Sequence, residues 1–413
     1  METYQEQAAQ RGGALDGIRV VDLTQMLAGP FCTQILADHG ADVIKIEGLG
    51  GDGTRANGPY REDDDLREFG GYFQSVNRNE RSIAVDLKTP HGIEIVYRLI
   101  EDADIVVENF RAGVMERLGL SYEQLRERNP RLVYGAVRGF GDPRSGISPY
   151  AEWPAYDVVS QAMGGMMGIT GPDRHTPMKI GPGVGDTVPA LMLCIGLLAA
   201  VLRARETGEG QFVDVAMADC VLAMCERIVY QTSYTGAVPT PEGNRHPLLC
   251  PFGLFRARDG WVSIAVAHDG FWEKLAHAVG RPELIRDERF ATNAARVRNT
   301  QQVVDIIEAF TSVRSKAELA ECFGGQVPFG PVYTSKEIFE DPHYRARGML
   351  VEVEQPGSST PVKIAGVPVK LSATPGTVRR RAPRLGEHTE DVLRAAGYDA
   401  ASIAQLRAAG AIR

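Results

Sequence analysis

A carboxylate follows three alternating glycines in the segment 180–194, IGPGVGDTVPALMLC. Gly181, Gly183 and Gly185 leave the backbone bare just before Asp186, where a long apolar helix is predicted to begin. An aspartate at a helix start meets free N–H groups and the positive end of the helix dipole, which keep it ionised and fixed in place. These properties suit a nucleophile, but aspartate is also a favoured helix N-cap. Local physics alone favours the cap, although a cap does not need three glycines.

A second glycine cluster stands in ADVIKIEGLGGDGTR, residues 41–55, where Gly48, Gly50 and Gly53 form a literal G-x-G-x-x-G. Such glycines bind a dinucleotide pyrophosphate when they join the first strand of a Rossmann fold to its helix. Here the glycines follow the second predicted strand, after Glu47, and not the first. The polar sequence that comes after them has no apolar stripe with which a helix could pack. The stretch is therefore predicted to be a flexible loop and not an NAD site.

Basic and amide side chains gather near several predicted strand ends. The segment VENFRAGVMERLG ends a strand and begins a helix, which is where open α/β sheets bind ligands. Asn109, Arg111 and Arg117 in it are candidates for holding phosphates or polar amides, with a solvated helix surface as the alternative. Lys88 and Arg138 also lie near strand ends, so the sequence predicts a basic cluster at one edge of the sheet.

Strands and helices alternate along the first 230 residues. Strands are predicted at 17–24, 41–47, 81–88, 104–110, 132–139 and 211–217. Helices are predicted at 30–40, 90–103 and 218–230, and from residue 188 onward. Such alternation with few hairpin signals predicts an α/β fold built on a Rossmann-like, doubly wound parallel sheet.

A smaller α+β domain is predicted after this sheet, because residues 252–266 read as a hairpin that turns at Asp259-Gly260 and helical segments follow. The predicted organisation is a large domain at 1–230, a linker at 231–251, a small domain at 252–332, a second linker at 333–348, and a C-terminal part at 349–413 that returns to the large domain.

Composition excludes several classes of function. The formal net charge is -8, so the chain lacks the sustained basic surface that nucleic acids or anionic membranes require. Six cysteines without a C-x-x-C pair and eight histidines without ligand spacing predict no metal site. The start METYQEQAAQRGGA does not resemble a signal peptide, and the longest apolar run, 188–202, is shorter than the roughly 20 residues of a membrane span. These features predict a cytoplasmic protein with reduced thiols.

Several segments together resemble the class III CoA-transferases, the formyl-CoA transferase type that includes carnitine CoA-transferase. They are LDGIRVVDLTQMLAGPFCTQILADHGADVIKIE, NRNERSIAVDLKTPHG, ADIVVENFRAGVMERLGL, YDVVSQAMGG, GVGDTVPA and PRLGEHTEDVL. These segments span nearly the whole chain, and their common order is more specific than any one of them.

The resemblance implies that Asp186 is the nucleophile, which passes through a mixed anhydride and an aspartyl-CoA thioester. It implies acyl-CoA and small carboxylic acids as substrates, no permanently bound cofactor and an interlocked homodimer. CoA contacts are implied, by motif match, at Leu27, Ala28, Val85, Lys88, Asn109, Phe110, Arg117 and Tyr156.

The chain departs from the formyl-CoA enzymes, which carry Gln where Leu27 stands and Arg where Gly48 stands. The departures favour dicarboxylates such as succinate, and Arg245 and His246 in GNRHP are candidates for holding the second carboxylate of the acceptor.

Two alternative functions stay open. One is an α-methylacyl-CoA racemase, which uses a His/Asp pair where this chain has Tyr156 before an aspartate. The other is a CoA-binding protein without turnover.

Overall fold

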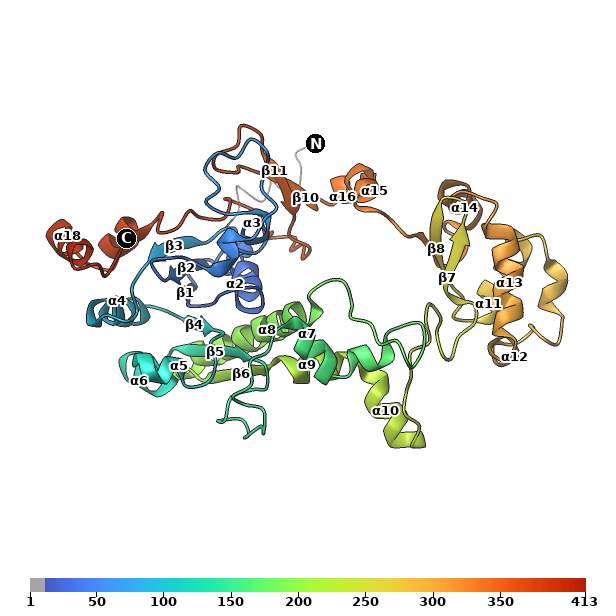
Figure 1. Cartoon of the computed structure of the whole chain (residues 1–413), viewed down its shortest axis with the longest axis horizontal. Helices are drawn as coiled ribbons and strands as arrows, with labels where there is room; N and C mark the ends of the chain where they lie inside the picture. Colours follow the sequence, from blue (N-terminus) through green and yellow to red (C-terminus); the bar gives the residue numbers. More distant parts are fainter. Residues whose placement is uncertain (1–11) are drawn as a thin grey trace. The chain divides into compact units, whose positions relative to one another are not determined.

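The structure, a computed structural model, describes residues 12–413 and divides into two compact units. The larger unit comprises residues 12–166, 180–229 and 342–413, and the smaller unit comprises 167–179 and 230–341. Each unit has its own apolar core. Figure 1 follows the chain through both units by colour.

Six parallel strands form the sheet of the larger unit, in the order β3-β2-β1-β4-β5-β6 (Figure 1). Their bounds are β1 (Arg19–Asp22), β2 (Asp42–Glu47), β3 (Arg81–Ala84), β4 (Ile105–Glu108), β5 (Val133–Arg138) and β6 (Phe212–Ala216). The chain winds outward from β1 in one direction and from β4 in the other, so a topological switch point lies between these two neighbours. The predicted doubly wound parallel sheet is confirmed.

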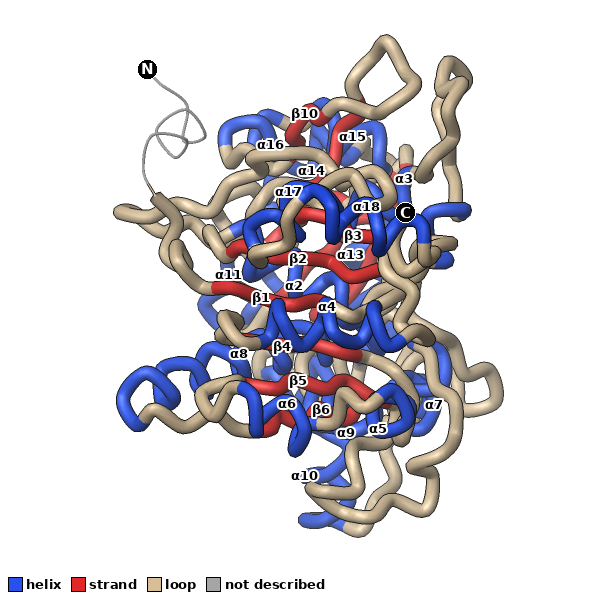
Figure 2. Tube along the Cα trace, turned by 90° about the vertical axis from the view of Figure 1, so that its left-hand side faces the viewer, coloured by secondary structure: helices blue, strands red, loops and turns tan. Residues whose placement is uncertain are grey.

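Five helices cover one face of this sheet (Figure 2). They are α4 (Pro90–Ile100), α5 (Val114–Leu118), α6 (Tyr122–Arg128), α17 (Thr389–Ala395) and α18 (Ala400–Ala408). Strand residues such as Val21 and Val106 share one buried cluster with Ile95 of α4 and Leu393 of α17. The end of the chain therefore helps to bury the strands formed near its beginning.

Two long helices, α2 (Ala28–Asp38) and α8 (Val184–Thr207), cover the opposite face, with α9 (Met217–Met224) packed beside α8. Val20 and Val107 point to this face because side chains alternate along a strand. Within residues 12–413, α8 alone is long and apolar enough to cross a membrane by composition. Its residues Leu193 and Leu197 are fully buried in the cluster with the sheet, so α8 is a core helix.

Shorter elements complete the chain outside these two layers. They are η1 (Gly53–Ala56), α3 (Gly71–Val76), α7 (Asp157–Met163), η2 (Met166–Ile169), α10 (Glu226–Thr235), α15 (Ser335–Glu340), α16 (Pro342–Ala346), β10 (Leu350–Val353) and β11 (Val362–Ala365). Strands β10 and β11 pair with each other in antiparallel orientation.

The smaller unit contains a three-stranded antiparallel sheet and several helices. The elements are β7 (Phe252–Ala257), β8 (Gly260–Ala265), β9 (Phe329–Pro331), α11 (Asp269–Ala278), η3 (Pro282–Ile285), α12 (Asn293–Arg298), α13 (Thr300–Thr311) and α14 (Lys316–Phe323). The predicted hairpin of β7 and β8 is confirmed, but it turns at Arg258-Asp259, one residue before the predicted position, because Gly260 already pairs with Ala257. Trp272, Leu275 and Phe323 lie in its buried core.

Several short helices differ from the prediction. Helix α10 runs into the segment 231–251 that was predicted to be a linker, and α15 and α16 lie within 333–348. Helix α18 was not predicted at all. These helices have few apolar positions, so the periodicity that reveals longer helices is weak in them. One of them has a cap that its sequence shows: Thr334 and Glu337 form a capping box at the start of α15.

Candidate active site

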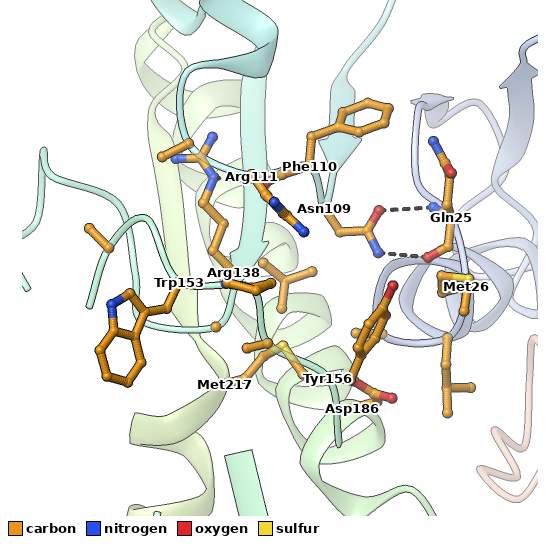
Figure 3. A pocket seen from close by; sticks show the side chains of 18 of the residues that line it. Gln25, Met26, Asn109, Phe110, Arg111, Arg138, Trp153, Tyr156, Asp186 and Met217 are labelled. Carbon is orange, nitrogen blue, oxygen red and sulfur yellow. Dashed lines mark hydrogen bonds between the residues drawn. The ribbon is translucent and has the colours of Figure 1, made fainter. Parts of the chain in front are cut away.

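A cavity of about 430 Å³ opens at the carboxyl ends of β1, β4 and β5, at the topological switch point where open α/β sheets bind ligands (Figure 3). All of its lining residues belong to the larger unit. They are Gln25, Met26, Leu27, Ala28, Tyr72, Asn109, Phe110, Arg111, Ala112, Val137, Arg138, Gly139, Ala151, Trp153, Pro154, Ala155, Tyr156, Asp186 and Met217.

Asp186 lines the cavity from the first turn of α8 (Figure 3). The N-cap of this helix is Gly183, and Asp186 is its third residue. The helix-cap interpretation of Asp186 is therefore wrong. A different carboxylate approaches the free N–H groups: Oδ1 of Asp157 accepts a hydrogen bond from the Gly185 N–H at 2.8 Å. Because Asp157 takes over this role, the Asp186 side chain is available to the cavity.

Asp157 is fixed by its neighbours at the start of α7. The Gln161 side chain donates from Nε2 to both carboxylate oxygens of Asp157, at 2.8 and 3.0 Å. Helices α7 and α8 approach so closely that a Cβ on Gly185 would lie 2.5 Å from the Asp157 carbonyl oxygen. Close packing of two helix starts thus requires glycine at this position.

Burial, and after it the negative charge of Asp157, raise the pKa of Asp186 to about 7. The sequence predicted the opposite, an aspartate kept ionised by the helix start. The direction differs because another carboxylate uses the Gly185 N–H and adds a like charge beside Asp186. A more basic carboxylate is a better nucleophile once it is ionised, and groups with such shifts cluster at functional sites.

Asn109 holds the turn that follows β1. Its side-chain oxygen accepts a hydrogen bond from the Gln25 N–H at 2.8 Å, and its Nδ2 donates to the Gln25 carbonyl oxygen at 2.7 Å, as the dashed lines in Figure 3 show. Both ends of the amide are therefore used within the protein. The two turns that flank the switch point are tied together by this one side chain.

A buried ion pair fixes the neighbouring turn after β4. Arg138 contacts Glu108 at 2.5 Å and also pairs with Asp142. Glu108 accepts a hydrogen bond from the Phe110 N–H at 2.7 Å, and Arg138 donates from Nε to the Phe110 carbonyl oxygen at 3.3 Å. Burial raises the pKa of Glu108 to about 7 even though Arg138 opposes the shift. Arg138 is thus paired with two buried carboxylates, whereas Arg111 is the lining cation that forms no ion pair within residues 12–413.

Comparison with known proteins identifies the family. A sequence model of CoA-transferase family III matches residues 15–389. The chain belongs to CoA-transferase family III. It is 47% identical to a succinyl-CoA:mesaconate CoA-transferase of Haloarcula hispanica, over 93% of this chain and 97% of that protein. It is 40% identical to a succinate–glutarate CoA-transferase of Agrobacterium fabrum, over 92% and 94% of the two chains.

Solved structures agree with this assignment. The crystal structure of a CAIB/BAIF family protein from Brucella suis matches with a TM-score of 0.83 and 37% identity, and the match covers 94% of this chain and 100% of that one. As a family III CoA-transferase, the protein is an enzyme that takes CoA thioesters as substrates. Within the described residues, no group of three or more His, Cys, Asp or Glu side chains is arranged to hold a metal ion.

The structure brings most of the predicted site residues of this CoA-transferase to the cavity. They are Leu27, Ala28, Asn109, Phe110, Arg111, Tyr156 and Asp186. Val85, Lys88 and Arg117 do not line it. Val85 is fully buried among the core residues, whereas Lys88 and Arg117 are exposed. Whether these side chains touch CoA stays a prediction.

The predicted acceptor residues lie in the smaller unit. Arg245 donates a hydrogen bond to the Gln301 side chain at 2.9 Å, and the ring of His246 lies 5.0 Å from that of Phe252. Neither residue is among those that line the cavity. Their assignment to the second carboxylate of an acceptor also stays a prediction.

Sequence reasoning missed two aromatic residues of the CoA-transferase cavity, Tyr72 and Trp153. Burial, and after it the charges of Asp186, Asp52 and Asp157, raise the pKa of Tyr72, so its hydroxyl is protonated at neutral pH. The rings of Trp153 and Tyr150 pack at 4.8 Å in the loop before α7. Tyr72 lies on a six-residue helix and Trp153 in a loop, so no periodic pattern pointed to either.

Proposed function

We propose that this enzyme moves CoA from succinyl-CoA to a second dicarboxylic acid, with Asp186 as the covalent nucleophile. The observation that carries the proposal is the setting of Asp186. It is the only carboxylate among the described residues that line the switch-point cavity, and its pKa is raised to about 7 by burial and by Asp157. A carboxylate that serves only structure would accept hydrogen bonds at such a helix start, as Asp157 does.

The reaction we propose exchanges acyl groups in four steps. The Asp186 carboxylate attacks the thioester carbonyl of the donor, which gives a mixed anhydride and CoA thiolate. The thiolate then attacks the Asp186 carbonyl carbon, which releases the donor acid and leaves an aspartyl-CoA thioester. The acceptor carboxylate attacks this thioester to form a second anhydride. The thiolate finally attacks the acceptor acyl carbon, which yields the new acyl-CoA and free Asp186.

The cavity suits these steps physically. Every intermediate is activated toward hydrolysis, so the reacting carbonyl must be kept from water. Apolar side chains, among them Leu27, Val137 and Met217, supply part of the wall. Arg111 supplies a positive charge at the same wall, which favours an anionic ligand such as CoA or a carboxylic acid.

The choice of dicarboxylates rests on the relatives. The names of three similar enzymes specify succinyl-CoA with mesaconate, succinate with glutarate, and succinyl-CoA with D-citramalate. Identity to the first is 47%. We therefore propose succinyl-CoA as donor and mesaconate as the first acceptor to test, in the cytoplasm where soluble CoA thioesters are found.

The racemase alternative is less well supported. A racemase that removes the α-proton with a His/Asp pair needs a histidine at the reacting centre. No histidine is among the described residues that line the cavity, and Tyr156 stands before Asp157 where that base is expected.

A substrate panel tests the proposed function directly. The purified enzyme is incubated with succinyl-CoA and either mesaconate, glutarate, citramalate, oxalate or formate, and the CoA thioesters are separated by chromatography. We expect new thioesters from the dicarboxylates and little from formate. Hydroxylamine added during turnover should yield a hydroxamate on Asp186 detectable by peptide mass spectrometry. Loss of optical purity of a 2-methylacyl-CoA with no acyl exchange would instead indicate a racemase, and the transferase proposal would fail.

We also propose that two chains form the interlocked homodimer implied by the resemblance. The outer side of α8 exposes Leu191, Met192, Ile195 and Leu202, of which Ile195 and Leu202 are 64% and 67% exposed. Contiguous apolar surface of this kind is uncommon on monomers.

Sedimentation equilibrium tests the dimer. We expect twice the mass of one chain, unchanged on dilution to nanomolar concentration, because linked chains cannot separate without unfolding. An Ile195→Glu variant should be monomeric or insoluble, since it places a charge in the proposed interface. A stable monomer of the unaltered chain at micromolar concentration would refute the dimer.

A further inference from the structure

We propose that Asp52, carried by the glycine-rich loop 48–53, is a positioning residue of the transfer reaction that holds the Met26 backbone at the cavity wall. The expected effect of Asp52 on the rate rests on the proposed function, but the hydrogen bond between Asp52 and the Met26 N–H does not. The loop that carries the G-x-G-x-x-G pattern thus has a role that involves no nucleotide.

Met26 has a backbone conformation that needs support. Its φ is +70°, in the left-handed region where the Cβ of a non-glycine residue crowds the backbone. It lines the cavity together with Gln25, Leu27 and Ala28, directly before α2 begins. A strained residue at a ligand-binding turn persists only when its surroundings hold it.

Asp52 provides this support. The Met26 N–H donates to Oδ2 of Asp52 at 3.2 Å and lies 3.5 Å from Oδ1. Asn109 holds the preceding residue, Gln25, through two hydrogen bonds. Two consecutive residues of the turn are therefore fastened by side chains from two different loops.

Hydrogen bonds and a buried lysine hold Asp52 in place. It is buried, its Oδ1 accepts hydrogen bonds from the backbone N–H and the hydroxyl of Thr54, at 2.9 and 2.8 Å, and its own N–H donates to Glu47 at 3.0 Å. Nζ of Lys45, which is fully buried, lies 3.7 Å from Oδ2 of Asp52. The carboxylate is thus fixed in position before any substrate arrives.

Lys45 also reaches the other end of the turn. It donates a hydrogen bond to the Thr24 carbonyl oxygen at 3.0 Å and lies 3.6 Å from Asp22. Burial lowers the pKa of Lys45, but Asp22 and other nearby carboxylates outweigh burial and raise it, so the ammonium group stays charged. One buried cation therefore connects Thr24 and, through Asp52, Met26.

The loop geometry fits this role. A Cβ on Gly48, Gly50 or Gly53 would meet no atom within 4 Å, so the packing of the loop does not require glycine at these three positions. The glycine that the loop requires is Gly51, whose φ is +79°. It turns the chain directly before Asp52.

Kinetics of three variants test the proposal in the full-length enzyme. Asp52→Ala removes the acceptor of the Met26 N–H, and we expect kcat to fall about tenfold to a hundredfold, because displacement of a site wall by about 1 Å costs this much. Asp52→Asn keeps one acceptor oxygen and should retain more activity than Asp52→Ala. Thr54→Val is the matched control, because it removes a hydrogen bond to Asp52 and leaves Met26 bound. It should lower the melting temperature and leave kcat within about twofold.

A coupled variant separates positioning from simple loss of structure. Glycine adopts a φ of +70° without strain, so in a Met26→Gly background the change Asp52→Ala should lower kcat less than about threefold. If Asp52→Ala and Thr54→Val lower kcat equally, or if Met26→Gly leaves the effect of Asp52→Ala unchanged, the positioning role is overturned.

Hydrogen exchange gives a readout that does not depend on activity. The amide of Met26, followed by mass spectrometry of peptides spanning residues 20–30, should exchange at least tenfold faster in Asp52→Ala than in the unaltered enzyme or in Thr54→Val. If the enzyme transfers no CoA but this amide responds as expected, the proposed function fails and the contact stands. If transfer occurs and the amide is unchanged in Asp52→Ala, the positioning proposal fails alone.

Discussion

Replacing Asp186 with asparagine should lower kcat for CoA transfer at least about 10³-fold, because an amide cannot form the anhydride or the aspartyl thioester. The change keeps the shape of a side chain that lines the cavity from the first turn of α8. Initial rates with succinyl-CoA and mesaconate measure the effect. The hydroxylamine-trapped adduct should disappear at the same time.

Stability provides the control for Asp186→Asn. The pKa of Asp186 is raised to about 7 in the folded protein, whereas an unfolded aspartate has a pKa of about 3.9. Between these values the folded state holds more protons than the unfolded state, so the carboxylate lowers the unfolding free energy as pH rises from about 4 to about 7. The asparagine variant should therefore melt at a higher temperature than the unaltered enzyme at pH 8, and by a smaller margin at pH 4. Transfer that continues undiminished in a folded Asp186→Asn enzyme would refute the nucleophile.

Much of the fold could be predicted because its strands are short apolar runs separated by glycine-ended helices. Val20, Val43 and Val106 are nearly or fully buried, which is why β1, β2 and β4 were visible as apolar runs. The structure of the chain beyond residue 397 was harder to predict from the sequence. Helix α18 buries only Ile403 and Leu406, and it shares a buried cluster with strands β1 to β5, which all lie in the first third of the chain.

The glycine-rich loop shows where local patterns mislead. Its polar sequence predicted a flexible segment, but Thr54 and Arg55 are buried. Arg55 forms two hydrogen bonds to Glu47, at 2.7 and 2.6 Å, and its guanidinium lies 3.9 Å from the centre of the Phe73 ring. A loop packed through ion pairs has no apolar stripe, so hydropathy cannot reveal its order.

The same limit applies to the site. Local position made Asp186 and Asn109 candidates, because they stand at a helix start and a strand end, whereas the choice of Asp186 as nucleophile and of Phe110 as a CoA contact came from the family resemblance. Spacing could not show that Asp157, and not Asp186, accepts a hydrogen bond from the start of α8, because the two residues are brought together only by the packing of α7 on α8. Burial, and after it the charge of a residue far away in the sequence, raise the pKa of Asp186, and both depend on the fold.

The pH dependence of kcat/KM should report this pair of carboxylates. Only ionised Asp186 attacks the thioester, so kcat/KM for succinyl-CoA should fall below about pH 7, roughly tenfold for each pH unit, and level off above about pH 8. The negative charge of Asp157 disfavours ionisation of Asp186. An Asp157→Asn change should therefore move the midpoint to lower pH. Burial is the larger cause of the shift and remains, so the midpoint should stay above about 4.

Glu390→Gln is the matched control for this profile. Glu390 is an exposed carboxylate on α17 that pairs with Arg394, and it takes no part in the cavity. Its removal changes the net charge by the same amount as Asp157→Asn, yet the midpoint should stay in place. Asp157→Asn also alters the acceptor of the Gly185 N–H, so its plateau rate is expected to fall, and the midpoint is the informative quantity. A midpoint that stays near 7 or rises in Asp157→Asn would show that Asp157 does not set the ionisation of Asp186.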